Sequence, residues 1–175
     1  MPIDSAANPC ELYGCSGPFV AGLTWSDARG PSAIVITEEW EALETGNRQG
    51  LRAQRFMVLK EENIKQTWRH IDATENWCDN GLGLVGDVLL TDLNDDGVAE
   101  VTFVYNIEGS CDVSPIAYRL VLHTGVGEGE LEIRGDLVLP IHGDVPSEIV
   151  RSPALEPGAG PFAAFADSVW KARVR

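Results

Sequence analysis

A nine-residue segment, Asp92 to Glu100, constrains this chain more than any other part of its sequence. Oxygen-bearing side chains occupy its first, third, fifth and ninth positions, and glycine occupies the sixth. In chain order these residues are Asp92, Asn94, Asp96, Gly97 and Glu100. Alternate oxygen ligands, with a glycine where the backbone must reverse, are typical of short loops that wrap around Ca²⁺. We therefore expect a calcium loop, in which the backbone carbonyl of Val98 is a further ligand.

Electrostatics also favours a bound cation in this segment. Three carboxylates held ~5 Å apart repel one another by about 3 kcal/mol per pair at an effective dielectric constant near 20. A divalent cation reverses the sign of that energy, so the loop should be loose without one. The alternative is an acidic turn of the Asp-Asp-Gly kind, which joins two strands and needs no ion.

The residues around the segment predict that it joins two strands. Val101, Phe103 and Tyr105 alternate with Thr102, Val104 and Asn106, a period of two that predicts a strand with one buried face. An apolar stretch at 84–90 precedes the loop. An EF-hand requires a bidentate Glu at its twelfth position, which is Phe103 here, so the loop is not an EF-hand.

Other segments predict more strands and little helix. Runs rich in β-branched and aromatic residues predict strands at 33–37, 52–60, 63–71, 116–123 and 130–139. In the second and third of these we expect five residues to face inward, namely Phe56, Val58, Ile64, Trp68 and Ile71. The stretch from Glu38 to Leu43 could begin a short helix. Helical spacing of apolar residues predicts one closing helix at about 161–173, with Lys171 and Arg173 at its negative end.

The predicted fold class is therefore mainly β (α+β), an antiparallel meander of about seven or eight strands with one C-terminal helix. Residues 1–20 are rich in Pro, Gly and Ser and predict an irregular N-terminal arm. Residues 21–175 predict a single β-rich domain, since 175 residues suffice for one ordinary core.

The chain is strongly acidic, and this restricts its partners. Its formal net charge is −14, from 27 acidic and 13 basic residues, which disfavours binding to nucleic acid. Residues 70–118 contain ten acids and no Lys or Arg, so cations or a basic protein would be drawn there, although a solvated acidic face explains the same pattern. No apolar run is long enough to span a bilayer, and no signal peptide is visible in the first twenty residues.

The four cysteines provide evidence on whether the protein is found in an oxidising or a reducing cellular compartment. Bridges Cys10–Cys15 and Cys78–Cys111 would suit an oxidising compartment, although four cysteines allow three pairings. The alternatives are a zinc site, for which the spacing is poor, and four reduced thiols in a cytosolic protein. We expect a periplasmic or cell-surface protein, with the cytoplasm left open.

Beyond the loop, a longer set of residues resembles a known family. In order these are Trp25-Ser26-Asp27, Ile34-Val35-Ile36, Trp68-Arg69, Cys78, Thr91 to Tyr105, Cys111 to Pro115, and Arg134-Gly135. Over roughly residues 20–175 the chain resembles a bacterial family named for surface polysaccharide biosynthesis, and its loop is similar to the Asp-x-Asn-x-Asp-Gly-x-x-Glu loops of integrin-like (FG-GAP) repeats. The resemblance implies a small, exported, mostly antiparallel β domain with Cys78 and Cys111 as a pair. The family name assigns no reaction.

These observations support three hypotheses of function. The first is a calcium-binding, non-enzymatic β domain of the bacterial envelope that acts as an accessory or binding module for surface glycan. The second is an acidic inhibitor or immunity protein that covers a basic toxin or a lysozyme-like enzyme. The third is an envelope hydrolase that uses the acidic loop. The sequence shows no catalytic arrangement, its three histidines (His70, His123 and His142) suggest structural roles, and it does not predict an oligomeric state.

Overall fold

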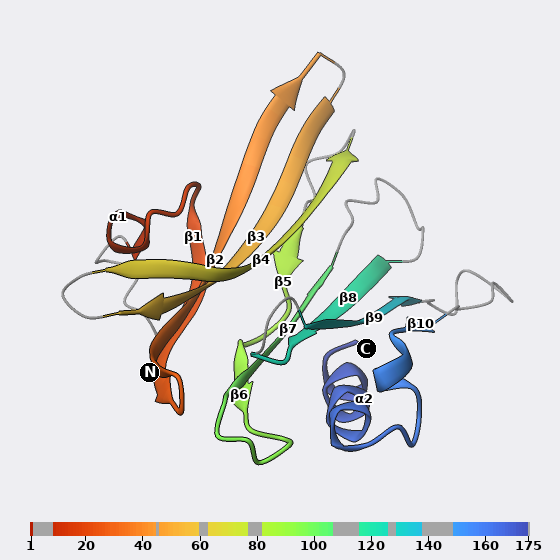
Figure 1. The fold of residues 1–175 in the computed structure, drawn as a ribbon. Helices are drawn as coiled ribbons and strands as arrows, with labels where there is room; N and C mark the ends of the chain where they lie inside the picture. Colours follow the sequence, from red (N-terminus) through yellow and green to blue (C-terminus); the bar gives the residue numbers. More distant parts are fainter. Residues whose placement is uncertain are drawn as a thin grey trace, which may run out of the picture.

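The computed structural model describes residues 1, 9–44, 46–59, 63–76, 82–106, 116–125, 129–137 and 149–174. These residues form ten strands in two antiparallel sheets and one long C-terminal helix (Figure 1). The predicted fold class, mainly β with one C-terminal helix, is confirmed.

The first sheet is a four-stranded meander in which each strand pairs with the next along the chain. Its strands are β1 (Phe19–Asp27), β2 (Gly30–Leu43), β3 (Gly46–Val58) and β4 (Ile64–Asn76). A tight turn joins β1 to β2, and β2 pairs with β3 up to Leu43 opposite Gly46. Gly30 at φ 105° and Gly46 at φ 116° adopt backbone conformations that favour glycine. The far end of the β2–β3 hairpin extends beyond the rest of the molecule (Figure 1).

The second sheet has the strand order β10-β9-β8-β7-β5, and β6 also pairs with β7. Its strands are β5 (Gly83–Leu84), β6 (Leu89–Thr91), β7 (Glu100–Asn106), β8 (Ile116–His123), β9 (Glu130–Leu137) and β10 (Val150–Arg151). The short 3₁₀ helix η3 (Pro153–Leu155) and the helix α2 (Pro161–Arg173) follow β10. The closing helix therefore lies where the sequence predicts it.

The two sheets pack face to face and share the main core. The first sheet contributes Ile34, Ile36, Leu51, Ala53 and Trp68, and the second contributes Val101, Phe103, Tyr105 and Val121. The outer face of the second sheet is covered by η3 and α2, with Ala166, Val169 and Trp170 buried against it (Figure 1). A short helix, α1 (Pro9–Tyr13), packs on the outer face of the first sheet, where Tyr13 contacts Phe56.

This layering corrects the prediction that β7 buries one face only. Val101, Phe103 and Tyr105 face the first sheet, but Thr102 and Val104 on the opposite face are also fully buried. The reason is α2, which covers the face that the alternating pattern would leave to solvent.

Two local predictions were also wrong. Glu38 to Leu43 is the second half of β2, because each of these residues pairs with β3 up to Leu43 opposite Gly46. Ile71 does not face inward and is 46% exposed. Ile71 lies three residues after Trp68, so regular alternation places it on the outer face when Trp68 faces the main core. Ile64 also packs on the outer face, because a bulge between Gln66 and Trp68 shifts the register of β4.

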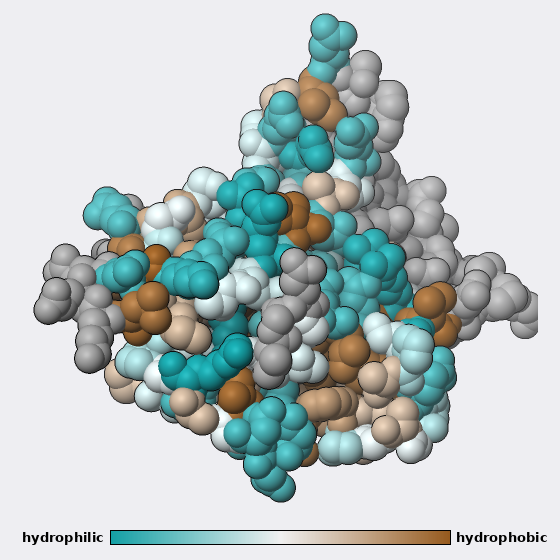
Figure 2. All heavy atoms as spheres, in the orientation of Figure 1, coloured by the Kyte–Doolittle hydropathy of each residue, from teal (hydrophilic) through white to brown (hydrophobic). Residues whose placement is uncertain are grey.

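The surface visible in Figure 2 is mostly hydrophilic, with small and separate hydrophobic areas. Among the helices in the described ranges, none is long and apolar enough to cross a membrane.

Candidate functional site

The predicted calcium loop connects β6 to β7, and Thr91 pairs with Glu100 across its base. The prediction that it joins two strands is therefore confirmed. Asp95 at φ 56° and Gly97 at φ 76° turn the backbone through the left-handed region, which is rare for residues other than Gly, Asn and Asp.

Three of the predicted ligands lie together on the inside of this turn. Asp92 accepts hydrogen bonds from the backbone N–H groups of Asp96 (3.1 Å) and Gly97 (3.0 Å). The side-chain amide of Asn94 donates to Asp96 Oδ2 at 2.9 Å, and Asn94 Oδ1 accepts from the backbone N–H of Asp96 at 3.3 Å. Asp96 Oδ1 also accepts from the N–H of Val98 at 2.7 Å. All three side chains are exposed, so their oxygens are accessible from solvent.

Glu100, the fourth side chain, is completely buried beneath the loop. Its Oε2 accepts hydrogen bonds from the N–H of Leu93 (2.9 Å) and the hydroxyl of Thr91 (3.0 Å), whereas its Oε1 has no hydrogen-bond partner. Burial raises the pKa of this carboxyl, and the charge of Asp92 acts in the same direction. A buried carboxylate oxygen without a partner is costly unless a cation or a proton compensates it.

The loop is not a closed ligand cluster as it stands. Asp92, Asp96 and Glu100 do not bring three carboxylate oxygens, one from each residue, within 4.8 Å of one another. Among the described His, Cys, Asp and Glu residues, a different set of three does so, and it is described below. Asp95, which was expected to lie between ligand positions, is exposed. Calcium ligation by the loop thus stays a prediction.

Asp27, at the end of β1, anchors the second half of the loop to the first sheet. Its Oδ2 accepts hydrogen bonds from Trp25 Nε1 (2.8 Å), from the N–H of Ala99 (3.2 Å) and from Arg55 (3.2 Å), and its Oδ1 accepts from the N–H of Arg29. Burial by itself would raise the pKa of Asp27, but these hydrogen bonds and the charge of Arg55 more than offset it and lower the pKa.

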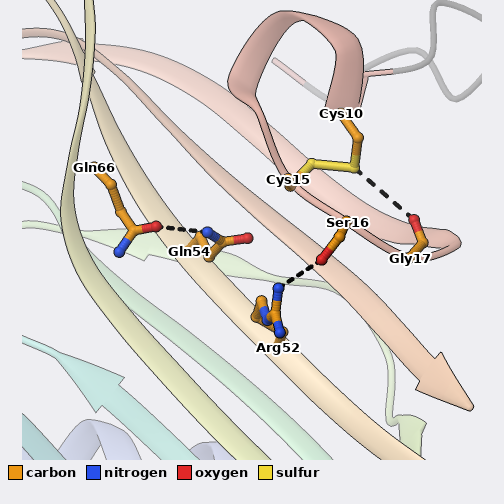
Figure 3. The surroundings of a disulfide bond; sticks show 7 residues. All are labelled: Cys10, Cys15, Ser16, Gly17, Arg52, Gln54 and Gln66. Carbon is orange, nitrogen blue, oxygen red and sulfur yellow. Dashed lines mark hydrogen bonds between the residues drawn. A yellow bond between two sulfur atoms is a disulfide. The ribbon is translucent and has the colours of Figure 1, made fainter. Parts of the chain in front are cut away.

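The N-terminal segment contains the predicted Cys10–Cys15 disulfide, which is typical of an oxidising compartment (Figure 3). The bridge closes a short turn that leads into Ser16 and Gly17, and Ser16 Oγ accepts a 2.6 Å hydrogen bond from Arg52 on β3. Cys78 and Cys111, the other predicted pair, lie outside the described residues.

A second polar cluster, which the sequence analysis missed, lies between the two sheets. His70 on β4 places its Nδ1 at 3.1 Å from both carboxylate oxygens of Glu130 on β9. Glu132, two residues along β9, belongs to the same cluster, and the ligand atoms of these three residues all lie within 4.8 Å of one another. The exposed side chain of Arg134 pairs with Glu132 Oε2.

The other nitrogen of His70 is held by a chain of hydrogen bonds. Nε2 lies 2.8 Å from the hydroxyl of Tyr105, which donates to Asp72 Oδ2 at 2.8 Å. Asp72 is paired with Arg119 at 2.6 Å. Burial, reinforced by the charge of Asp72, raises the pKa of Tyr105, so the hydroxyl keeps its proton.

The sequence shows which of these residues share a strand face, but it does not show that the two faces meet. Trp68, His70 and Asp72 alternate along one strand, and Glu130, Glu132 and Arg134 alternate along another, so each set shares a face. His70 and Glu130 are sixty positions apart in the sequence, so no local pattern indicates that they are in contact.

The projecting β2–β3 hairpin carries a third feature, a hollow of about 460 Å³ on the outer face of the first sheet. Trp40, 61% exposed, lines it together with Arg48 of β3 and Ile71 of β4. Ser16, Gly17 and Pro18, which follow the Cys10–Cys15 bridge, form part of its wall.

In comparisons with known proteins, no protein-family model, curated protein or solved structure matches this chain.

Proposed function

We propose that this chain is a calcium-binding β-sandwich module in which the ion organises the β6–β7 loop. The observation that carries the proposal is Glu100 Oε1, a buried carboxylate oxygen with no partner, beneath the inward-facing oxygens of Asp92, Asn94 and Asp96. Oxygen ligands of this kind and number suit Ca²⁺, and the carbonyl of Val98 would add one more. Ion binding would draw Glu100 and the three upper side chains closer together.

The role of the ion would be structural. Bound Ca²⁺ would compensate the buried charge of Glu100 and join the loop to a base that Asp27 already fixes on the first sheet. A non-enzymatic accessory role in the bacterial envelope, with a surface glycan as ligand, is part of the same proposal and follows from the resemblance described above. The Cys10–Cys15 disulfide is consistent with that location.

Calcium titration followed by thermal unfolding tests the proposal. The melting temperature of the native chain should rise by roughly 5–10 °C when Ca²⁺ reaches about 100 times its Kd, because such binding adds about 2.7 kcal/mol to the free energy of unfolding. Asp96→Asn should abolish the shift. Asp95→Asn, which removes the same charge from an exposed neighbour, should retain it.

Glu100→Gln provides an independent test. In EDTA this variant should be more stable than the native chain at pH 7, because a neutral amide costs less to bury than a carboxylate. In millimolar Ca²⁺ the order should reverse. If neither Asp96→Asn nor Glu100→Gln alters the response to Ca²⁺, the ion is not bound by this loop.

A specific observation favours a second candidate function, an acidic inhibitor that binds a basic enzyme. Trp40 on the projecting hairpin is 61% exposed, and four glutamates lie within four residues of it along the chain: Glu38, Glu39, Glu41 and Glu44. A protruding acidic segment with an aromatic anchor suits a cationic cleft, since opposite charges speed association and a buried aromatic ring contributes much of the affinity.

Binding to a basic lysozyme-type enzyme at low and high salt tests this candidate. We expect saturable binding at low salt that weakens at least tenfold when Trp40→Ala is introduced or when Glu41→Gln and Glu44→Gln are combined. The double variant Asp87→Asn/Glu156→Gln makes the same change in net charge at exposed sites elsewhere and should bind like the native chain. Equal losses in both double variants would show general charge attraction and rule out a hairpin site.

A further inference from the structure

We propose that His70, Glu130 and Glu132 form a binding site for a divalent transition-metal ion, with Zn²⁺ as the best match, between the two sheets. The site is separate from the β6–β7 loop and does not depend on calcium binding. Its ligands come from β4 of the first sheet and β9 of the second, so the ion would link the two layers.

Counting hydrogens shows that the cluster needs a cation. The single hydrogen of the Tyr105 hydroxyl is donated to Asp72, so His70 Nε2 must carry the hydrogen in its contact with Tyr105. A neutral His70 therefore turns the lone pair of Nδ1 toward both oxygens of Glu130, at 3.1 Å each. Two acceptors at this distance require a positive species between them, either a proton on Nδ1 or a metal ion.

The surroundings of Nδ1 favour a metal ion over a proton. A proton on Nδ1 would serve Glu130 alone, and among the described residues the second carboxylate of the cluster, Glu132, is compensated only by the half-exposed Arg134. Imidazole and carboxylate groups are the ligands that Zn²⁺ takes, at distances of about 2.0–2.2 Å. Two such ligand atoms 3.1 Å apart subtend an angle of about 95° at a common ion, which a four- or five-coordinate site accommodates.

The hydrogen bonds behind His70 are those that a ligating histidine needs. Donation from Nε2–H to Tyr105, and from Tyr105 to an Asp72 neutralised by Arg119, fixes the tautomer with Nδ1 free to coordinate. Tyr105 is therefore a positioning residue for the site. Glu130 also lines a hollow of about 600 Å³ with Trp68 and Arg69, through which an ion can approach and where a fourth ligand can sit.

Arg134 would compete with the metal ion for the carboxylate of Glu132. It pairs with Glu132 Oε2 through two nitrogen atoms, but half of its side chain is exposed, so it can move away at little cost. The metal site thus predicts an effect that a purely structural ion pair does not: removal of Arg134 should improve metal binding.

The test is calorimetric titration of the full-length, untagged chain with Zn²⁺, in millimolar Ca²⁺ throughout so that the β6–β7 loop is not the acceptor. We expect one Zn²⁺ per chain. His70→Gln should abolish binding, Tyr105→Phe should weaken it about 10- to 100-fold, and Arg134→Gln should strengthen it several-fold. Asp96→Asn changes the calcium loop, away from the cluster, and should bind Zn²⁺ as the native chain does.

Two outcomes would overturn the proposal: no saturable binding by the folded native chain, or binding that persists unchanged in His70→Gln. Should His70→Gln fail to fold, Glu132→Gln and Arg134→Gln decide the matter, since both lie at the accessible side of the cluster. Zn²⁺ affinity that is lower in Glu132→Gln and higher in Arg134→Gln supports the site, and unchanged affinity in both contradicts it.

Discussion

His123 is a buried imidazole whose environment keeps it neutral. Its ring stacks on that of Trp68, with centroids 4.4 Å apart, and its Nδ1 lies 3.1 Å from the carbonyl oxygen of Gly129. Burial lowers the pKa of His123 to about 4, and the positive charge of Arg55 acts in the same direction. Because the unfolded chain binds a proton at this residue near pH 6.5, folding and protonation compete in the range between the two values.

We therefore expect the free energy of unfolding to fall as the pH is lowered from 6.5 to 4. The unfolded state takes up the proton first, so the stabilisation is complete above pH 6.5 and lost below pH 4. The full effect amounts to about 3 kcal/mol for a shift of this size. Urea unfolding at several pH values measures it.

His123→Asn is the matched variant, because the amide can still donate to Gly129 but does not titrate. It should be less stable than the native chain at pH 7, yet its stability should change much less between pH 4 and 6.5. A native chain whose stability is flat across that range would contradict the neutral state of His123. Asp27, whose pKa is lowered, stabilises the fold above its ordinary pKa of 3.8 and loses that effect only at still lower pH.

The turn that follows the Cys10–Cys15 bridge shows how one element depends on a glycine. Gly17 has φ 90°, and the backbone N–H of Glu38 donates to the carbonyl of the next residue, Pro18, at 2.9 Å. A Cβ at Gly17 would lie 2.1 Å from the backbone oxygen of Glu38, so neither strand β2 nor the turn can yield cheaply. This contact fixes Gly17 and Pro18 in the wall of the hollow that Trp40 also lines.

We expect Gly17→Ala to lower the free energy of unfolding by about 2–3 kcal/mol, from the clash and the strained backbone together. Gly14→Ala is the control, since Gly14 also has positive φ (66°) but no atom lies within 4 Å of an added Cβ. It should cost only about 1 kcal/mol. Denaturant unfolding under non-reducing conditions compares the two, and equal losses would show that the contact with Glu38 does not matter.

Single elements were predictable where the pattern depended on near neighbours. The β3 and β4 strands, the closing helix over Pro161–Arg173 and the loop between two strands all follow from short-range spacing. The second half of β2 was mistaken for a helix, because its residues are set by pairing with β3 and not by their own propensity. The predicted set of inward-facing residues was wrong because a bulge in β4 puts Ile64 and Trp68 on opposite faces, and regular alternation puts Ile71 on the face opposite to Trp68.

In the whole molecule, the surface where the two sheets meet gathers residues from distant parts of the chain. Asp27 and Arg55 of the first sheet bind Ala99 beside the loop, and His70 meets Glu130 across the same surface. Both proposed ion sites therefore adjoin contacts between the layers. The sheets could pack in this way because β2 and β7 are apolar on the faces that meet.

The sequence by itself determined the spacing of oxygen-bearing residues in the β6–β7 loop and the strand pattern on both sides of it, because each depends on residues only a few positions apart. The Cys10–Cys15 pairing was one of three that the sequence allowed, and the structure shows it. Tertiary structure alone decided that Glu100 is buried with one oxygen unpartnered, and that His70 lies beside Glu130 and Glu132. Alternation along a strand gives the face on which a side chain lies, but which other face packs against it depends on how the sheets stack.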